Sequence, residues 1–509
     1  MEKWVVAAKR ADFQKIGLKF GVDPVIARLI RNRDLVTEKE IDQYLHGRLS
    51  DIHSWKHFKD IQKLLGILTE KIEQKKKIRI IGDYDIDGVC STYILLKGLT
   101  RAGALADVDI PDRMKDGYGI SEELIDRAFA SQVDTIITCD NGISAVEQIV
   151  HGKALGMTVL VTDHHEVPYE EAEDGSVHTV LPPADAIVNP KQEDCTYPFK
   201  GICGAMVAFK VIWGLYESLG IPTDEMKKLI PFAAIATVGD VMDLTDENRI
   251  IVKEGLLRLQ NPENIGLKAL IRVNNLEDRE LTAYHIGFIL GPCMNASGRL
   301  STAKRALELL LTEDEKEASV LAEDLKMLND SRKDMTAKGV EQAVHMVEST
   351  SMEKDRVLVI YLPDCHESLA GIIAGRIRER YTKPVFVLTK GEHGVKGSGR
   401  SIEAYHMFQE MVKCKELFTK FGGHPMAAGL SMEEKDIETL RKKLNENCTL
   451  TADDMVEKIV IDVPMPMSYV TIPLIRQLSQ LEPFGKGNTK PVFAQKNLRI
   501  TDYRILGKN

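Results

Sequence analysis

Residues 77–88 read KIRIIGDYDIDG, an apolar, strand-like run that leads directly into three alternating aspartates. Two further runs have the same form: residues 133–139 lead into Asp140-Asn141-Gly142, and residues 158–162 lead into Asp163-His164-His165. A fourth apolar run, residues 232–239, ends at Asp240. In an open parallel sheet, ligands bind at the carboxyl ends of the strands. We therefore expect these side chains to meet at one edge of such a sheet.

So many carboxylates in one place would repel one another unless cations lay between them. Carboxylates with some imidazole and no thiolate suit hard to borderline ions, so Mn²⁺ is the preferred ion and Mg²⁺ the second choice. Two adjacent divalent ions can activate a water and neutralise a phosphoryl oxygen. The pattern therefore predicts hydrolysis of a phosphoester or phosphoanhydride.

Each motif also has a simpler interpretation when taken alone. Asp-x-Asp-x-Asp-Gly opens a calcium-binding helix-loop-helix, but the twelfth loop position, where that site needs Glu, is Ile94. Asp140-Asn141-Gly142 alone is typical of a turn, because Asn-Gly favours positive φ. The metal interpretation depends on the position that the motifs share.

Taken together, these motifs resemble those of the DHH phosphoesterase superfamily. Further segments resemble the RecJ family of single-strand-specific 5′→3′ DNA exonucleases within it: Pro111-Asp112-Arg113, Gly117-Tyr118-Gly119, Asn295-Ala296-Ser297-Gly298-Arg299, Gly397-Ser398-Gly399-Arg400-Ser401, residues 422–429 (GGHPMAAG) and residues 483–488 (PFGKGN). The last segment is similar to the entry of that family's oligonucleotide-binding fold. The resemblance runs from about residue 50 to the end.

The resemblance implies a single-stranded-DNA-specific exonuclease that releases nucleoside 5′-monophosphates by two-metal catalysis in DNA repair and recombination. Its metal ligands would be Asp85, Asp87, Asp140, His164 and Asp240, with Asp140 bridging the ions. Asp83 and Asp163 would ligate or orient ligands. His165 would stabilise the charge that develops during the reaction.

The same resemblance assigns substrate contacts. Arg113, Ser398 and Arg400 would hold the 5′ end, and Asn295, Arg299 and His424 would face the scissile or a neighbouring phosphate. Glycine lets backbone N–H groups approach a phosphate closely, which suits Gly422 and Gly423. Tyr118 is a candidate for base stacking, although a core tyrosine is the simpler interpretation.

Composition is consistent with this class. The 509 residues carry a net charge of −9 and eight scattered cysteines without a Cys-x-x-Cys pair, which argues against a disulfide framework or a zinc ribbon. Nothing resembles a signal peptide or a membrane span, so we expect a cytoplasmic protein without a membrane partner. Basic residues concentrate in the second half, where we expect a surface for DNA. We also expect a monomer, with a single-strand-binding protein and a helicase as further partners.

The pattern predicts an α/β protein with two α/β lobes and a long helix between them. The resemblance implies a C-terminal oligonucleotide-binding β-barrel, which we expect to be incomplete at Asn509. The expected divisions are 1–70, a helical region; 71–311, the DHH catalytic domain with a mostly parallel sheet; 312–350, the linker helix; 351–448, the DHH-associated substrate-binding domain; and 449–509, the truncated barrel.

Two departures from the family pattern leave open whether the chain is a divergent paralogue. Cys293 stands where the family has Arg in Gly-Pro-Arg-Ile-Asn, and Cys365 replaces the Trp of a Trp-His segment. Two other functions also stay open. One is a phosphodiesterase of short oligoribonucleotides or cyclic dinucleotides, and the other is a catalytically inactive DNA-binding scaffold.

Overall fold

The computed structural model describes residues 2–112, 119–171, 177–391 and 394–505. They form two units. The larger comprises Val6–Lys326 with the segment from Val460 onward, and the smaller comprises Met327–Ile459 with the first few residues. Arg113 and Tyr118, both expected near the substrate, lie outside the described residues.

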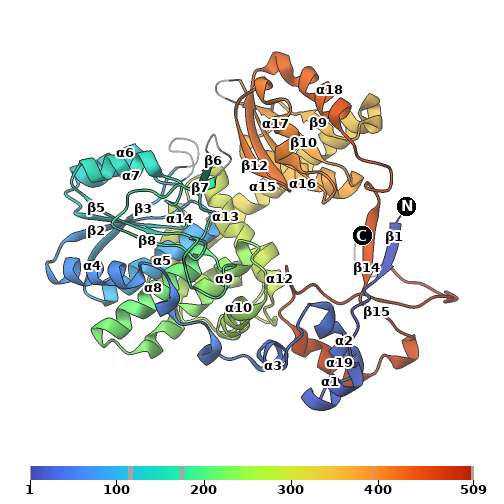
Figure 1. Cartoon of the computed structure of the whole chain (residues 1–509), viewed down its shortest axis with the longest axis horizontal. Coiled ribbons are helices and arrows are strands. Elements are labelled where there is room, and N and C mark those ends of the chain that lie inside the picture. Colours follow the sequence, from blue (N-terminus) through green and yellow to red (C-terminus); the bar gives the residue numbers. More distant parts are fainter. Residues whose placement is uncertain (1, 113–118, 172–176, 392–393, 506–509) are drawn as a thin grey trace. The chain divides into compact units, whose positions relative to one another are not determined.

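A parallel five-stranded sheet forms the centre of the larger unit, as the sequence predicted. Its order is β3 (Leu105–Asp109), β2 (Lys77–Ile81), β4 (Thr135–Cys139), β5 (Thr158–Thr162) and β8 (Ala186–Val188). Figure 1 shows helices on both faces: α4 (Ile61–Glu73), α5 (Ile86–Arg101) and α8 (Gly204–Leu219) on one, and α6 (Glu122–Ala130) and α7 (Val146–Ala154) on the other. All five residues of β4 are buried, as expected for a strand covered on both faces.

Helices follow the sheet along the chain. They are α9 (Ile230–Gly239), α10 (Asp246–Leu259), α11 (Ile265–Val273), α12 (Ala283–His285), a π-helical turn (Ile286–Leu290), α13 (Gly291–Leu300) and α14 (Lys304–Leu311). Residues 232–239 are therefore helical, unlike the strand-like runs of the other three motifs. Pro231 near the start of α9 and the alanines that follow suit a buried helix.

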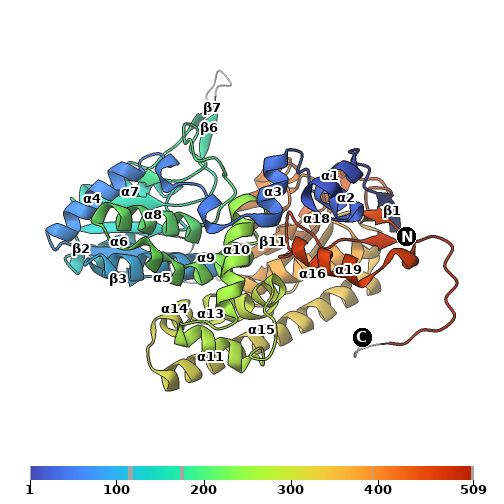
Figure 2. The same cartoon turned by 90° about the horizontal axis from the view of Figure 1, so that it is seen from below.

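One 35-residue helix, α15 (Glu315–Ser349), occupies the range expected for the linker, and it is continuous in Figure 2. The same view shows the β6 (Tyr169–Glu171) and β7 (Val177–Thr179) hairpin projecting from its unit. No described helix combines the length and the apolar character that crossing a membrane requires.

The N-terminal region is not wholly helical, which corrects the expectation for residues 1–70. Before α1 (Phe13–Phe20), α2 (Pro24–Asn32) and α3 (Glu38–His46), strand β1 (Glu2–Val6) pairs with β14 (Glu457–Ile461). Tryptophan and valine favour strands, and β14 offers a free edge. The three helices share a core with the C-terminal segment, where Ile26 and Leu29 belong to one cluster with Val463, Leu474 and Leu481.

The smaller unit contains a five-stranded mixed sheet. Its order is β12 (Phe418–His424), β13 (Ala427–Met432), β11 (Val395–Arg400), β10 (Val385–Lys390) and β9 (Leu358–Tyr361). One apolar cluster joins this sheet to α16 (Ala370–Tyr381), and another joins it to α17 (Met407–Val412) and α18 (Ile437–Asn447). The unit is therefore a second α/β lobe, as predicted.

The described part of the C-terminal segment holds a short parallel pair, β15 (Val463–Pro464) and β16 (Phe493–Ala494), with α19 (Ile472–Leu478) between them in sequence. Buried Asn488 organises this segment. It donates to the carbonyl oxygens of Leu481 and Pro483, and its own oxygen accepts from Arg33 and Tyr44. The residues 483–488 noted in the sequence thus attach the C-terminal segment to the N-terminal helices.

Candidate metal centre

The carboxyl ends of three neighbouring strands hold most of the predicted ligands. Asp83 and Asp85 follow β2, Asp140 follows β4, and His164 follows β5. Asp85 caps α5, because its carboxylate accepts from the backbone N–H groups of Asp87 and Gly88. The same loop therefore begins a helix and directs its aspartates to the sheet edge.

Asp240 joins this cluster from a helix, unlike the ligands that follow strands. It is the residue at which α9 ends, so its carboxylate comes from a helix C-terminus and not from a strand. Its Oδ2 nevertheless lies 3.8 Å from His164 Nε2. The structure therefore brings all four motifs together, although only three of them follow strands.

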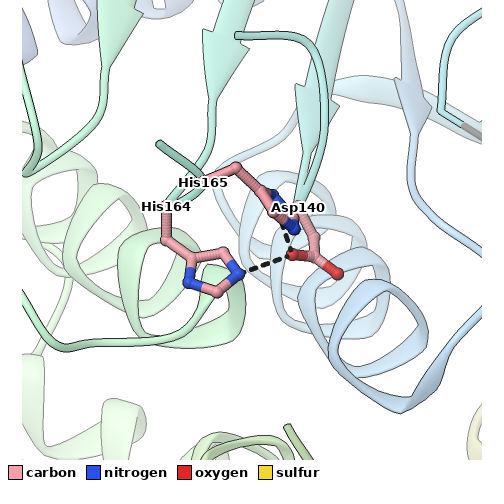
Figure 3. A group of neighbouring side chains, drawn as sticks. All are labelled: Asp140, His164 and His165. Carbon is pink, nitrogen blue, oxygen red and sulfur yellow. Dashed lines mark ion pairs between the residues drawn. The ribbon is translucent and has the colours of Figure 1, made fainter. Parts of the chain in front are cut away.

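Asp140 lies at the centre of the cluster. His164 Nε2 is 3.1 Å and His165 Nδ1 is 3.9 Å from its Oδ1 atom, so that both rings face one carboxylate oxygen (Figure 3). Three groups of residues each place their possible ligand atoms within 4.8 Å of one another: Asp140, His164 and His165; Asp87, His164 and Asp240; and Asp83, Asp85 and Asp140. Asp140 belongs to two of these groups. Its backbone has φ +60°, a left-handed conformation that aspartate tolerates better than most residues.

Two backbone groups that the sequence did not reveal hold Asp87. The N–H groups of Gly204 and Ala205, at the start of α8, donate to its two oxygens at 2.6 and 2.7 Å. A helix N-terminus carries partial positive charge and favours a carboxylate there. This arrangement fixes Asp87 in its orientation toward His164 Nε2, 3.5 Å away.

The carboxylates strongly perturb one another. Burial and the charge of Asp85 raise the pKa of Asp83 to about 7, and burial and the charge of Asp87 raise the pKa of Asp240 to about 8. Burial also raises the pKa of Asp85 and of Asp140, again with help from Asp87. Burial disfavours ionised groups and neighbouring negative charges add to the effect, so a cation between them would stabilise the ionised forms.

The residues fit divalent metal ions. Buried Asp83 Oδ1 and His164 Nδ1 have no hydrogen-bond partner among the described residues. The donors are carboxylate oxygens and imidazole nitrogens, which suit Mn²⁺ and, for the oxygens, Mg²⁺. Buried cysteines nearby, such as Cys90 and Cys139, are in none of the groups of ligand atoms found in the described part of the chain.

Asp163 is placed to orient its neighbours. Its oxygens accept from the backbone N–H groups of Ile143, His164 and His165, and Oδ1 lies 2.7 Å from His165 Nδ1. Burial alone would lower the pKa of His165, but Asp163 outweighs it and raises that pKa to about 9. Burial opposes ionisation of Asp163 too, yet the hydrogen bond and charge of His165 keep its pKa below the usual value. Asp163 thus holds the His165 ring in place beside the cluster.

Known proteins share this organisation along the chain. Residues 77–237 match the DHH family N-terminal domain, residues 354–449 the DHHA1 domain, and residues 461–509 the RecJ OB domain. The single-stranded-DNA-specific exonuclease RecJ of Escherichia coli (strain K12) is 32% identical over 530 residues, which cover 100% of this chain and 89% of that protein. The chain belongs to the RecJ family.

Two other RecJ proteins extend the comparison. The Bacillus subtilis (strain 168) single-stranded-DNA-specific exonuclease RecJ is 36% identical over 96% of this chain, and the chain spans only 60% of that relative's length. The crystal structure of RecJ from Thermus thermophilus in complex with Mn²⁺ superposes with a TM-score of 0.83 at 28% identity, covering 97% of this chain and 69% of that one. A second structure of that RecJ contains Mg²⁺. The acidic cluster of this RecJ-family chain offers carboxylate and imidazole donors of the kind that divalent metal ions bind.

Helix α13 of this RecJ-family chain lies against the loop that carries Asp83 and Asp85. Asn295 Oδ1 accepts the backbone N–H of Ile86 at 2.8 Å, so this predicted phosphate contact also orients the start of α5. Helix α13 passes so close to this loop that a Cβ atom added at Gly298 would lie 2.3 Å from the Tyr84 carbonyl oxygen. The next residue, Arg299, is therefore near the same loop. Cys293 is buried in α13 and faces Asn274, with Sγ 3.8 Å from its amide.

The remaining predicted substrate residues lie in the smaller unit. Ser398 and Arg400 are on β11, and the Arg400 guanidinium donates to Ser398 Oγ at 3.1 Å. Both lie beside Gly371 in the first turn of α16, where a Cβ atom would come within 2.9 Å of each. Gly422, Gly423 and His424 are the last three residues of strand β12, and all three are exposed.

Proposed function

We propose that this chain is a metal-dependent exonuclease that hydrolyses single-stranded DNA from the 5′ end and releases nucleoside 5′-monophosphates. The observation that carries the proposal is Asp140, which belongs to two groups of ligand atoms at the strand ends. The family comparison supports the choice of substrate, since the curated relatives are named single-stranded-DNA-specific exonucleases.

Two ions fit the arrangement, and we propose Mn²⁺ as the preferred one with Mg²⁺ as a substitute. Asp87, His164 and Asp240 form one group of ligand atoms and would hold one ion, and Asp83, Asp85 and Asp140 form another and would hold the second. Asp140 also shares a group with His164, so we propose it as the ligand common to both ions. When bound, such a pair activates a water and neutralises phosphoryl oxygens. Gly204 and Ala205 keep Asp87 oriented, and Asp163 orients His165.

His165 would stabilise the charge that develops on the reacting phosphate. Its hydrogen bond with Asp163 holds the ring beside Asp140, where it can stabilise negative charge that grows on a phosphate. Asn295 and Arg299, on α13, would bind the neighbouring phosphate, and Arg113, Ser398 and Arg400 would bind the 5′ end, helped by Gly422, Gly423 and His424. Arginine suits this task because its guanidinium pairs bidentately with phosphate oxygens.

Organisation and setting complete the proposal. The chain divides into an N-terminal region (1–70), the DHH catalytic domain (71–311), the linker helix (312–350), the DHH-associated domain (351–448) and the oligonucleotide-binding segment (449–509). The protein acts as a cytoplasmic monomer in DNA repair and recombination. A single-strand-binding protein and a helicase would supply its substrate, because a duplex must be opened before a single-strand-specific enzyme can act.

Digestion of a 20-nucleotide single strand labelled at its 5′ or 3′ end, with Mn²⁺, tests the proposal. The expected result is immediate release of labelled mononucleotide from the 5′ label, slow loss of the 3′ label, weak cleavage of duplex and no cleavage by Asp140→Ala. Cleavage of a dinucleotide alone would assign a small-substrate phosphodiesterase. DNA binding by wild-type protein without cleavage would assign a scaffold.

A further inference from the structure

A cavity of about 280 Å³ lies in the larger unit, between segments that are far apart in the sequence. Its walls come from the end of α2, from α3, from the start of α10 and from the loop that contains Gly487. The described residues that line it include none from the three groups of ligand atoms at the metal centre. Small-molecule pockets begin at about 300 Å³, so the cavity can hold one small ligand.

Two guanidinium groups lie near each other at this cavity. Arg33 follows the last residue of α2, and Arg249 lies near the start of α10. Burial and the charge of Arg33 lower the pKa of Arg249, so the two charges destabilise each other. Their hydrogen bonds go to uncharged oxygens: Arg33 donates to the side chain of Asn488 and the carbonyl oxygens of Leu29 and Thr489, and Arg249 to the carbonyl oxygens of Tyr44, Gln480 and Leu481. A guanidinium has five N–H groups, so donors and positive charge remain available to an anion.

Two carboxylates at the same cavity are held by other donors. Glu40 Oε2 accepts from the backbone N–H groups of Thr37 and Val36 at 2.7 and 2.9 Å, and these bonds lower its pKa. Asp246 Oδ1 lies 2.8 Å from His53 Nε2. Burial alone would raise the pKa of Asp246, but the hydrogen bond and charge of His53 outweigh it. Carboxylate oxygens accept more than one hydrogen bond, so the cavity favours a ligand with hydroxyl or amino donors as well as negative charge.

An aromatic ring completes the lining. Phe199 lies in the loop before α8, and its half-buried ring is at the cavity. Aromatic side chains stack on nucleobases with little preference for sequence, because every base has a π-face. Phosphate oxygens suit the two guanidinium groups, sugar hydroxyl or base amino groups suit the two carboxylates, and a base suits the ring. A nucleotide carries all three of these groups.

We propose that this cavity binds a free nucleoside monophosphate. Its phosphate would accept from Arg33 and Arg249, and its base would stack on Phe199. Its hydroxyl or amino groups would donate to Glu40 or Asp246. The walls belong to N-terminal helices, to α10 and to the C-terminal segment, so a bound nucleotide would hold these elements together and raise the melting temperature.

Isothermal titration of dAMP into Asp140→Ala protein tests the proposal, with EDTA to remove metal ions and a saturating 20-nucleotide strand to occupy the proposed substrate site. We expect one dAMP per chain, and weaker binding of inorganic phosphate or of deoxyadenosine, since each lacks one of the groups that the cavity fits. Gln43 lines the cavity and donates to Asp246 at 3.4 Å. Gln43→Glu adds a carboxylate there and should weaken dAMP binding roughly tenfold or more. Gln62→Glu adds the same charge at an exposed position of α4 and should bind dAMP like its parent.

A second variant separates the base from the phosphate. Phe199→Ala leaves both arginines in place and should weaken dAMP binding about 5- to 150-fold, with inorganic phosphate unaffected. Melting curves without ligand establish that each variant is folded. Absence of dAMP binding, or equal affinity in Gln43→Glu and Gln62→Glu, would overturn the proposal, and so would inorganic phosphate that binds as tightly as dAMP. The titration needs no cleavage, so its result is independent of the proposed function.

Discussion

The backbone N–H of Gly204 donates a 2.6 Å hydrogen bond to the carboxylate of Asp87, although 117 residues separate the two. Gly204 begins α8, and Asp87 lies in the first turn of α5. The two helices pack against each other on the same face of the sheet (Figure 1). This contact joins the packing of the domain to the orientation of a metal ligand, because α8 cannot shift without moving the carboxylate.

Gly204→Ala should weaken metal binding. The added Cβ would lie 2.7 Å from Asp140 Cβ and 2.9 Å from Asp140 Oδ1, so either α8 or Asp140 must move. Loss of groups that support ligands typically costs 10- to 100-fold in metal affinity, and we expect a loss of about that size in a Mn²⁺ titration. Gly66→Ala is the matched control, because nothing lies within 4 Å of its Cβ position. Equal affinities for the two variants would contradict this account.

Asp140→Asn should stabilise the metal-free protein while it abolishes cleavage. Asp140 is buried among carboxylates that raise its pKa, and the amide removes one of the repelling charges. We expect a higher melting temperature in the absence of metal, by about 1–2 °C for each kcal/mol gained in a unit of this size. With Mn²⁺ the order should reverse, since only the wild type gains stability from the ions. A lower melting temperature for metal-free Asp140→Asn would show that the cluster is not under repulsion.

Lys210→Met should strongly destabilise the larger unit. Lys210 Nζ lies 2.8 Å from Glu247 Oε2, and both side chains are fully buried. Removing one partner of a buried ion pair typically costs about 3–5 kcal/mol, because the other charge stays buried. Tyr197 donates to Glu247 at 2.5 Å and can also donate to a glutamine there. Lys210→Met/Glu247→Gln should therefore unfold at higher urea concentration than Lys210→Met, and additive losses would disprove the coupling.

The pair between His53 and Asp246, 2.8 Å apart, should make a pH-dependent contribution to stability. The hydrogen bond with Asp246 raises the pKa of His53, so this contribution is complete below the ordinary histidine value and is lost as pH rises through the raised pKa. In a double-mutant cycle with His53→Ala and Asp246→Asn, the coupling energy should be about 1 kcal/mol near pH 6 and close to zero near pH 9. A coupling energy equal at both pH values would contradict the assignment.

Much of the site was predictable because its motifs are local. Asp83, Asp140 and His164 each follow an apolar strand, and the shared edge of a parallel sheet predicts their meeting. Their grouping in the structure agrees with that prediction. The long helix that ends at Ser349 was also predicted from the sequence, because a long charged stretch mostly without glycine or proline favours a helix over a loop.

What the sequence did not reveal depends on contacts between distant segments. The run before Asp240 is apolar except for Thr237, so periodicity could not distinguish a buried helix from a strand. The sequence around Gly204 does not indicate that its N–H donates to Asp87. The sequence around Asn488 does not indicate that its side-chain oxygen accepts from Arg33 and Tyr44. The β1 strand was missed because its partner, β14, lies more than 450 residues later.

The account depends most on Asp140 as the ligand shared by two ions, and counting bound Mn²⁺ by equilibrium dialysis tests it directly. We predict two Mn²⁺ per wild-type chain, one in Asp83→Asn, whose carboxylate belongs to one group of ligand atoms, and weakening of both sites in Asp140→Asn. Electron paramagnetic resonance of the loaded wild type should show two coupled ions. A single Mn²⁺ in the wild type, or two tightly bound ions in Asp140→Asn, would contradict the account.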